Sequence, residues 1–433
     1  MEATNDPAAL IARFVELADQ GRWPAIEALF APNLAAVVSA DMIRAAWESE
    51  AAPLGDVVEF GGARTEPIDD ALTRVSVTVR FAKGDLTIFI ATAGDGLLQG
   101  LRIAAPGEWA APSYAAAKQF TEHEVVVGEG PLAVPGTLTV PRGAGPFPAA
   151  ILLSGGGPFD RDGTAGPLKP LKDLAWGLGS RGVASVRFDK VGAVHAGVLA
   201  EMLEFTAADE YLPYVRDAFR QLDQHPGIDS DRVYVVGHSM GAKMAPRAAE
   251  AEPRIAGLVL MAADATPMQR SAVRVVRYLA GLGVAPQEMV AVLEEQAANV
   301  ERADLSSSTP TEDLPLGYSG AYWLDMRGYD PVATAKKLTQ PMLILQGGRD
   351  YQVTVEDDLA LWRAGIGDRA DVDIRVYPAD NHMFAPGSGA STPAEYATPA
   401  NVDSVVVDDI VRWLAPEAPR GKRLFSGMRG RRG

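Results

Sequence analysis

The chain contains no cysteine. Disulfides, thiolate nucleophiles, zinc sites with cysteine ligands and iron–sulfur clusters are therefore all excluded. No stretch approaches the roughly 18 consecutive apolar residues that a membrane-spanning helix needs. The N-terminus also lacks the basic start and apolar run of a signal peptide. We therefore expect a cytoplasmic protein with no membrane partner.

Positive charge is in the minority, because 40 Lys and Arg residues face 56 Asp and Glu residues, for a formal net charge of −16. Such a surface repels phosphate groups, so nucleic acid is not expected as a partner. One segment departs from this balance. From Arg420 the chain runs RGKRLFSGMRGRRG, with no acid, and we expect residues 416–433 to form a flexible basic tail.

What the chain does contain is the composition of a globular protein, with 47% hydrophobic and 22% charged residues. Its 433 residues favour two domains. In residues 1–112, helical patterns at 7–18, 23–30 and 41–47 precede alternating segments at 72–81, 86–91 and 97–103, with turns at 83–85 and 94–96. This order predicts a small α+β domain, followed by a linker at 106–114.

Residues 113–415 show a different pattern, in which a strand pair at 124–127 and 132–140 precedes alternating strands and helices. Alternation of this kind predicts a mainly parallel, doubly wound α/β sheet. The connection at about 265–335 is too long for a simple crossover and predicts an inserted helical cap. The expected further strands are 149–153, 183–188, 232–236, 255–261, 342–345 and 372–376, and the expected helices 170–181, 208–224, 242–251, 356–364 and 402–414.

The sharpest motif is Gly237-His238-Ser239-Met240-Gly241. It directly follows an apolar strand pattern and directly precedes an alanine-rich helical one. A serine at such a junction, with glycine two residues to each side, is typical of a nucleophile elbow. The backbone of an elbow is strained and crowded, so a β-carbon at position 237 or 241 would clash. The motif predicts Ser239 as a nucleophile.

Residues from about 124 to 414 resemble the α/β-hydrolase superfamily. More narrowly, the segments LLSGGGPFDRDGT, VRFDKVG, GHSMG and LILQGGRDYQVT resemble those of bacterial esterases and of serine aminopeptidase-like or dienelactone-hydrolase-like proteins. The first 112 residues resemble a small cystatin-like domain of unknown function that often precedes such hydrolases. The resemblance implies serine hydrolase chemistry, with the orienting acid at Asp350.

Five histidines are candidates for the base that a serine nucleophile needs. His123 precedes the α/β region, His225 lies in a helix-to-strand loop, and His195 could line a pocket. His238 is adjacent to the serine, and we expect the elbow to point it away. His382 follows the last core strand, and it alone fits the order serine, acid, histidine of this fold.

The acid is expected to be Asp350, which ends the turn after the strand MLIL and so lies at the carboxyl edge of the sheet, where ligand sites form. Asp264, after the strand LVLM, is a rival, because some hydrolases place the acid there. Asp380 is too close in sequence to His382 for an orienting contact.

An oxyanion hole is expected from backbone N–H groups. Met240 follows the nucleophile and should provide one donor. The glycine loop after the strand AILL should provide the other, from Gly156 or, as second choice, Gly155. Related proteins often have histidine where Ser154 stands, which leaves the donor within this loop open.

Residues 160–162, Asp-Arg-Asp, follow this loop. Since no histidine or third acid accompanies them, ion pairs of Arg161 that hold the loop are expected rather than a metal site. We expect no metal and no cofactor. In the cap, Tyr318, Tyr322 and Trp323 form an aromatic cluster. It could line a pocket for a hydrophobic acyl or aryl group, or simply pack the cap on the core.

The predicted function is hydrolysis of carboxylic esters through an acyl-enzyme, with Ser239, His382 and Asp350 as the triad and a small-molecule acyl compound as the substrate. Thioester, lactone and amide cleavage use the same residues and stay open. The alternatives are an acyltransferase, a cyclase or a C–C bond-cleaving enzyme on the same fold. A non-catalytic binding module is disfavoured, because the catalytic set is complete. The N-terminal domain is expected to pack on the hydrolase domain, to shape access, or to form a homodimer.

Overall fold

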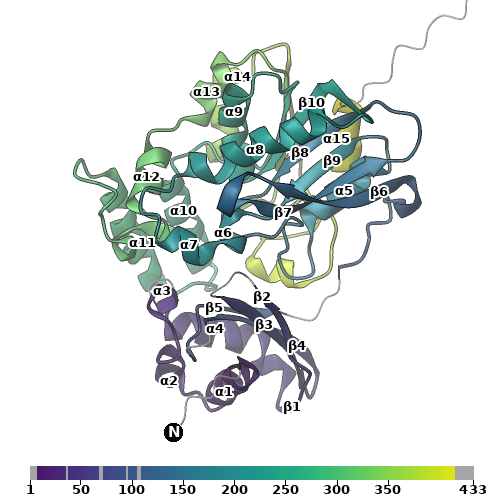
Figure 1. The fold of residues 1–433 in the computed structure, drawn as a ribbon. Helices are drawn as coiled ribbons and strands as arrows, with labels where there is room; N and C mark the ends of the chain where they lie inside the picture. The colour runs from purple at the N-terminus through teal and green to yellow at the C-terminus, as the bar shows by residue number, and fades with distance from the viewer. Residues whose placement is uncertain (1–6, 36–37, 68–71, 94–95, 105–108, 415–433) are drawn as a thin grey trace, which may run out of the picture.

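The computed structural model describes residues 7–35, 38–67, 72–93, 96–104 and 109–414. The basic tail lies outside the described residues, as do positions 94–95 of the predicted turn and 106–108 of the predicted linker. Two bodies follow one another along the chain, a small domain formed by the first hundred residues and a larger one built around a twisted sheet (Figure 1).

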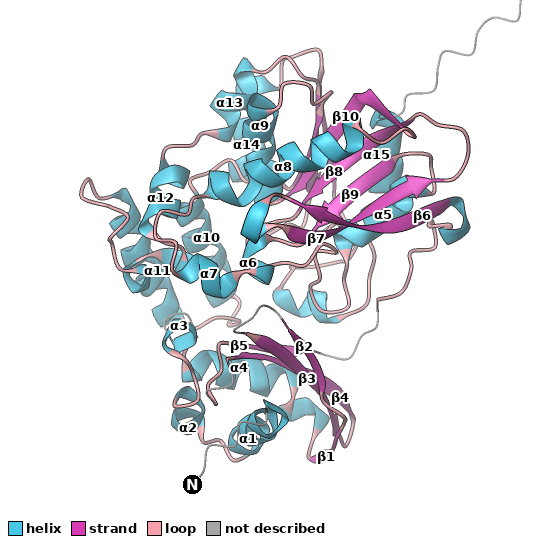
Figure 2. Ribbon diagram, in the orientation of Figure 1, coloured by secondary structure: helices cyan, strands magenta, loops and turns pink. Residues whose placement is uncertain are grey.

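The small domain packs helices on one face of an antiparallel sheet (Figure 2). Strand β3 is central, since it pairs with β1, β2 and β4, and β5 pairs with β4. The core joins the helices to β3 and β4 and includes Phe14, Trp47 and Ile88. The elements are α1 (Pro7–Asp19), α2 (Trp23–Glu27), α3 (Pro32–Ala35), α4 (Ala40–Glu50), β1 (Val57–Phe60), β2 (Arg64–Pro67), β3 (Thr73–Phe81), β4 (Gly84–Thr92) and β5 (Gly100–Ala104).

This arrangement confirms the predicted small α+β domain, with helices before strands. The sequence patterns did not predict strands β1 and β2. Strand β1 has four residues and little burial, with Val58 63% exposed, so it shows no alternation of buried and exposed positions.

The large sheet has eight strands in the order β13-β12-β11-β10-β8-β9-β7-β6. Adjacent strands from β13 to β9 run parallel to each other. Strands β7 and β6 are antiparallel and form one edge of the sheet. This confirms the predicted mainly parallel sheet. The strands are β6 (Phe120–Val127), β7 (Val134–Pro141), β8 (Phe147–Leu153), β9 (Ala184–Phe188), β10 (Ile228–His238), β11 (Leu258–Met261), β12 (Met342–Gly347) and β13 (Val372–Tyr377).

Helices cover both faces of this sheet (Figure 2). Alternate residues of each strand serve different faces, so Ile151 joins one core and Leu152 the other. The first core contains residues of α8 (Ala207–Asp223), α9 (Met240–Ala251) and α14 (Ala360–Ile366). The second contains residues of α5 (Pro170–Gly179) and α15 (Ser404–Leu414).

A long helical insertion separates β11 from β12. It contains α10 (Met268–Gly281), α11 (Gln287–Glu301), α12 (Gly320–Arg327) and α13 (Pro331–Lys337). Helices α10 and α11 pack on each other, whereas α13 packs on α9 and α14 and so belongs to the layer that covers the sheet. None of the helices in the described ranges is both long and apolar enough to cross a membrane.

Candidate active site

Ser239 lies between the last residue of β10 and the first of α9, at φ 55° and ψ −120°. A non-glycine residue at positive φ is strained, and such strain is concentrated at functional sites. The neighbouring glycines allow the backbone to crowd together. A β-carbon on Gly237 would lie 2.4 Å from the oxygen of Gly241, and one on Gly241 would lie 2.5 Å from the oxygen of Leu153. The clash predicted for both positions is confirmed.

Two loops at the carboxyl edge of the sheet pack backbone against backbone. One follows β12 and the other follows β13. A β-carbon on Gly347 would lie 2.6 Å from the oxygen of Asn381, and one on Gly348 would lie 2.7 Å from the Cα of Pro378. Glycine is therefore needed at both positions for the loop of Asp350 to reach the loop after β13.

This approach brings Asp350 to His382. The distance from His382 Nδ1 to Asp350 Oδ2 is 2.7 Å, and both side chains are buried. Asp350 Oδ1 accepts hydrogen bonds from the backbone N–H groups of Gln352 and Val353, at 2.8 and 3.0 Å. Because an ionised carboxylate only accepts, His382 Nδ1 carries the proton and Nε2 keeps a free lone pair.

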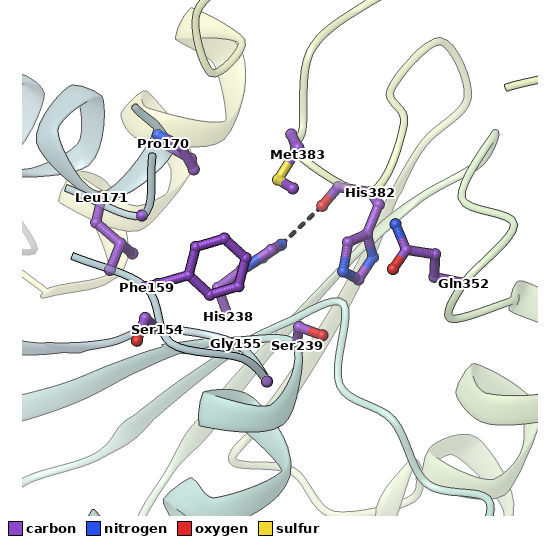
Figure 3. A pocket seen from close by; sticks show the side chains of 12 residues that line it. Ser154, Gly155, Phe159, Pro170, Leu171, His238, Ser239, Gln352, His382 and Met383 are labelled. Atoms are coloured by element: carbon purple, nitrogen blue, oxygen red, sulfur yellow. Dashed lines mark hydrogen bonds between the residues drawn. The ribbon is translucent and has the colours of Figure 1, made fainter. Parts of the chain in front are cut away.

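Ser239 and His382 line the same cavity, of about 80 Å³ (Figure 3). In the described part of the chain the Ser239 hydroxyl makes no hydrogen bond, so it is available to the imidazole or to a ligand. Apolar side chains form much of the wall. The remaining lining residues are Ser154, Gly155, Gly156, Phe159, Gly163, Pro170, Leu171, His238, Gln352 and Met383.

The glycine loop after β8 lies directly against the elbow. A β-carbon on Gly155 would lie 3.2 Å from Ser239 Cβ, and one on Gly156 would lie 3.7 Å from Met240 Cβ. The backbone amides of Gly155, Gly156 and Met240 donate no hydrogen bond to any described residue. Three N–H groups without a partner among the described residues therefore lie beside the serine, and each is able to donate to an anionic oxygen.

His238 does not point away from the site as the sequence led us to expect. Its side chain lines the cavity, and Nε2 lies 2.7 Å from the backbone oxygen of His382 (Figure 3). A carbonyl oxygen only accepts, so Nε2 carries the proton. Burial, together with the neighbouring His382, lowers the pKa of His238 to about 4. His238 is therefore neutral at pH 7, and it holds the backbone of His382 in place.

The other three histidines have partners that do not line the cavity. His195 Nε2 lies 2.9 Å from the oxygen of Ala133, and His225 Nδ1 accepts from the N–H of Gly227 at 3.1 Å. His123 lies 3.0 Å from the hydroxyl of Thr121. His382 is the histidine that the fold pairs with a carboxylate at the cavity.

Asp264, the rival acid, is engaged elsewhere. Its carboxylate is 3.1 Å from Lys243 Nζ, and accepts from the hydroxyls of Thr266 and Ser271 at 3.2 and 3.0 Å. All these partners lie in α9 or at the start of the insertion. The structure therefore brings Asp350, and not Asp264, to a histidine.

Residues 160–162 brace the loop, as predicted. Arg161 pairs with Asp189 and Glu124, at 3.1 and 2.6 Å. Asp162 pairs with Arg187 at 2.9 Å. Among the described residues, no group of three histidine or acidic side chains is arranged to hold a metal ion.

The aromatic residues of the insertion divide into two kinds. Tyr322 and Trp323 are buried and are absent from the cavity lining. Tyr322 Oη donates to Glu210 at 2.8 Å, and Trp323 Nε1 donates to the oxygen of Pro315 at 3.2 Å. Tyr318 stacks on Tyr322 with 4.2 Å between ring centroids. Its hydroxyl lies 3.7 Å from the point that a β-carbon on Gly156 would occupy, so it faces the glycine loop.

Asp380, two residues before His382, is 1% exposed, and neither of its carboxylate oxygens has a hydrogen-bond partner among the described residues. Burial and the nearby Asp403 raise its pKa to about 7, while Arg349 opposes the rise. The pKa of Asp380 is therefore higher in the folded than in the unfolded protein, and folding favours the protonated carboxyl. The contribution of this group to the stability of the fold is lost as the pH rises from about 4 to 7.

We therefore expect Asp380→Asn to stabilise the protein by about 1–3 kcal/mol at pH 8, because it removes an unpartnered buried charge. The gain should shrink as the pH falls toward 5, where the native carboxyl is protonated. Urea denaturation at both pH values measures it. The exposed Asp368→Asn is the control and should show no such change. A gain for Asp380→Asn that is equal at both pH values would contradict the prediction.

Residues 163–385 match the serine aminopeptidase (S33) family. Over 373 residues, 85% of each protein, the chain is 35% identical to esterase EstD of Thermotoga maritima. It is also 30% identical to 2,6-dihydropseudooxynicotine hydrolase of Paenarthrobacter nicotinovorans. That alignment has 142 residues and covers 32% of this chain and 33% of that protein. The solved structure of Est1E from Butyrivibrio proteoclasticus aligns at 16% identity and a TM-score of 0.44, over 67% of this chain and 99% of that one.

The family match spans the elbow and both loops that carry the paired acid and histidine. By this match and by its likeness to EstD over most of its length, the chain belongs to the serine aminopeptidase (S33) family of α/β-hydrolases.

Proposed function

We propose that this protein hydrolyses carboxylic esters through an acyl-enzyme, with Ser239 as nucleophile, His382 as general base and Asp350 as the acid that orients it. One observation carries the proposal. His382 is bound to Asp350 through Nδ1, and it lines one small cavity together with a strained, unbonded serine. This arrangement leaves Nε2 as the only nitrogen of the ring that can accept the serine proton.

The reaction follows from these positions. Ser239 Oγ attacks the ester carbonyl while His382 Nε2 takes its proton. The carbonyl oxygen becomes an anion, which the N–H of Met240 and that of Gly156 or Gly155 would stabilise, by about 3 kcal/mol for each donor. His382 then returns the proton to the leaving alcohol. Water attacks the acyl-enzyme by the same route, which releases the carboxylic acid and restores the serine.

The cavity favours a short acyl group. At about 80 Å³ it is much smaller than the roughly 300–1,000 Å³ of drug-sized ligand sites, and Phe159, Leu171 and Met383 give it apolar walls. An aminopeptidase needs a partner for the free ammonium group of its substrate. None of the described residues that line the cavity is acidic. The cavity therefore supports an ester substrate, in agreement with the name of the relative EstD.

We expect kcat/KM for p-nitrophenyl acetate or butyrate to exceed that for the decanoate at least tenfold, because a ten-carbon chain cannot enter this cavity. Leucine p-nitroanilide should not be cleaved. Initial rates measured at matched concentrations test both statements. Leu171→Ala shortens a side chain that lines the cavity and so enlarges the cavity. This variant should raise the decanoate rate relative to the acetate rate.

Equal rates for all chain lengths would contradict a short acyl group, and cleavage of the anilide at the rate of the esters would favour a peptidase. Product analysis with added alcohols tests the acceptor. Water should remain the main acceptor, whereas an acyltransferase would convert most of the acyl group to one preferred ester.

A further inference from the structure

A buried cation lies behind the glycine loop. Lys190, two residues after β9, is 4% exposed. Its Nζ donates to the backbone oxygen of Gly155 at 3.0 Å and to Tyr211 Oη at 2.7 Å, and it lies 2.9 Å from Glu210 Oε1. The ammonium group thus has an acceptor for each of its three protons. The proposed mechanism does not use this lysine.

The contact with Gly155 matters because of the geometry of the peptide bond. The oxygen of Gly155 and the N–H of Gly156 belong to one planar trans unit, so they point in opposite directions. When Lys190 holds the oxygen on one side, the N–H is directed to the other. A charged donor on the oxygen also polarises the unit, which makes the N–H a stronger donor.

The preceding peptide unit is held in the same way. Tyr211 Oη lies 3.0 Å from the oxygen of Ser154 and 3.2 Å from that of Gly155. The N–H paired with the Ser154 oxygen is that of Gly155. Both candidate donors of the loop therefore belong to peptide units whose oxygens are bound from behind by the Lys190–Tyr211 pair.

Glu210 holds the lysine in place and favours its charged form. Burial lowers the pKa of Lys190, and the attraction of Glu210 opposes that change. The second carboxylate oxygen of Glu210 accepts from Tyr322 Oη of α12 at 2.8 Å. A continuous line of buried polar contacts thus runs from the insertion to the glycine loop.

A gain in the stability of the fold does not by itself explain the buried ion pair of Lys190 and Glu210. Taking two charges out of water is costly, and replacing a buried ion pair by apolar residues is often neutral or stabilising. A function that needs the charge at this point gives a better reason, and the atom nearest to the active site that Lys190 touches is the Gly155 oxygen.

We propose that Lys190 is a positioning residue for ester hydrolysis, which orients and polarises the Gly155–Gly156 peptide so that its N–H stabilises the oxyanion. This inference rests on the proposed function. Glu210 and Tyr322 hold the lysine in this position.

The test removes the ion pair as a unit, with Lys190→Met combined with Glu210→Gln, so that no unpaired charge is left buried. We expect kcat for p-nitrophenyl acetate to fall by about 10- to 100-fold, less than or comparable to the loss of one oxyanion donor. KM should change by less than about threefold. The Ki of a trifluoromethyl ketone should rise by the same factor as kcat falls, because its adduct with the serine places an anionic oxygen at the same amide.

The chain offers a matched control. Lys243 and Asp264 form a second ion pair of similar burial, 2% and 7% exposed, and Lys243 Nζ contacts the oxygen of Thr266 rather than the glycine loop. Lys243→Met with Asp264→Asn should alter the melting temperature to a similar degree but leave kcat and the Ki within about twofold.

Unchanged kcat and Ki in the Lys190/Glu210 variant would overturn the inference, and so would equal losses in both double variants. If the first variant does not fold, Tyr322→Phe tests the same line of contacts. It should lower kcat two- to tenfold and raise the Ki by the same factor, and no change in either would overturn the inference. Absence of ester turnover by the unmodified protein would instead contradict the proposed function.

Discussion

Ser239→Ala is expected to lower kcat for p-nitrophenyl esters by about 10⁴- to 10⁶-fold, the range seen when a triad serine is removed. The substitution removes only a hydroxyl, which makes no hydrogen bond within the described part of the chain. Alanine has the same β-carbon as serine at φ 55°, so the backbone strain is unchanged. The melting temperature should therefore stay within about 2 °C. Steady-state rates and thermal unfolding measure the two effects.

A fluorophosphonate probe gives a second measure of the same residue. The unmodified protein should carry one adduct on the peptide that contains Ser239, and the alanine variant none. Ser404→Ala, at the exposed start of α15, is the control and should label as the unmodified protein does. Full ester turnover by Ser239→Ala would end the assignment of the nucleophile.

Asp350→Asn should lower kcat by about 10³- to 10⁴-fold through the tautomer of His382. The backbone N–H groups of Gln352 and Val353 both donate to Oδ1, so the asparagine oxygen must remain there. The amide NH2 then faces His382 Nδ1, where the carboxylate oxygen Oδ2 was. A donor at this place requires Nδ1 to accept, which puts the proton on Nε2 and leaves no lone pair for the serine. Kinetics on folded protein, verified by circular dichroism, measure the loss.

The control addresses the rival acid. Asp264 is paired with Lys243 and with two hydroxyls, none of which lines the cavity. The Lys243→Met and Asp264→Asn double variant should therefore keep kcat within about twofold despite any loss of stability. A greater kcat loss in this variant than in Asp350→Asn would transfer the acid role to Asp264.

Most of the large sheet was predictable because its central strands are buried on both faces. Runs such as 149–153 and 342–345 are almost entirely apolar, and the structure has strands there. The same reasoning fails for β1, which is short and exposed and so has no pattern to detect. The predicted cap, at about 265–335, also included most of α13. In the structure α13 packs on α9 and α14. The sequence could not distinguish the two, because helix spacing does not reveal the partner of an apolar face.

By itself, the sequence predicted the elbow, because its strand, serine, glycines and helix are contiguous in the chain. A β-carbon on Gly237 would clash with Gly241, only four residues away. The order proposed for nucleophile, acid and base follows from the fold that the sequence resembles. Only the tertiary structure decided how the remaining side chains pair. It turned His238 toward the carbonyl of His382, gave Asp264 to Lys243, and placed Lys190 behind Gly155. The partners in these contacts are 144, 21 and 35 residues apart, so they depend on which loops pack together and on nothing that a short motif contains.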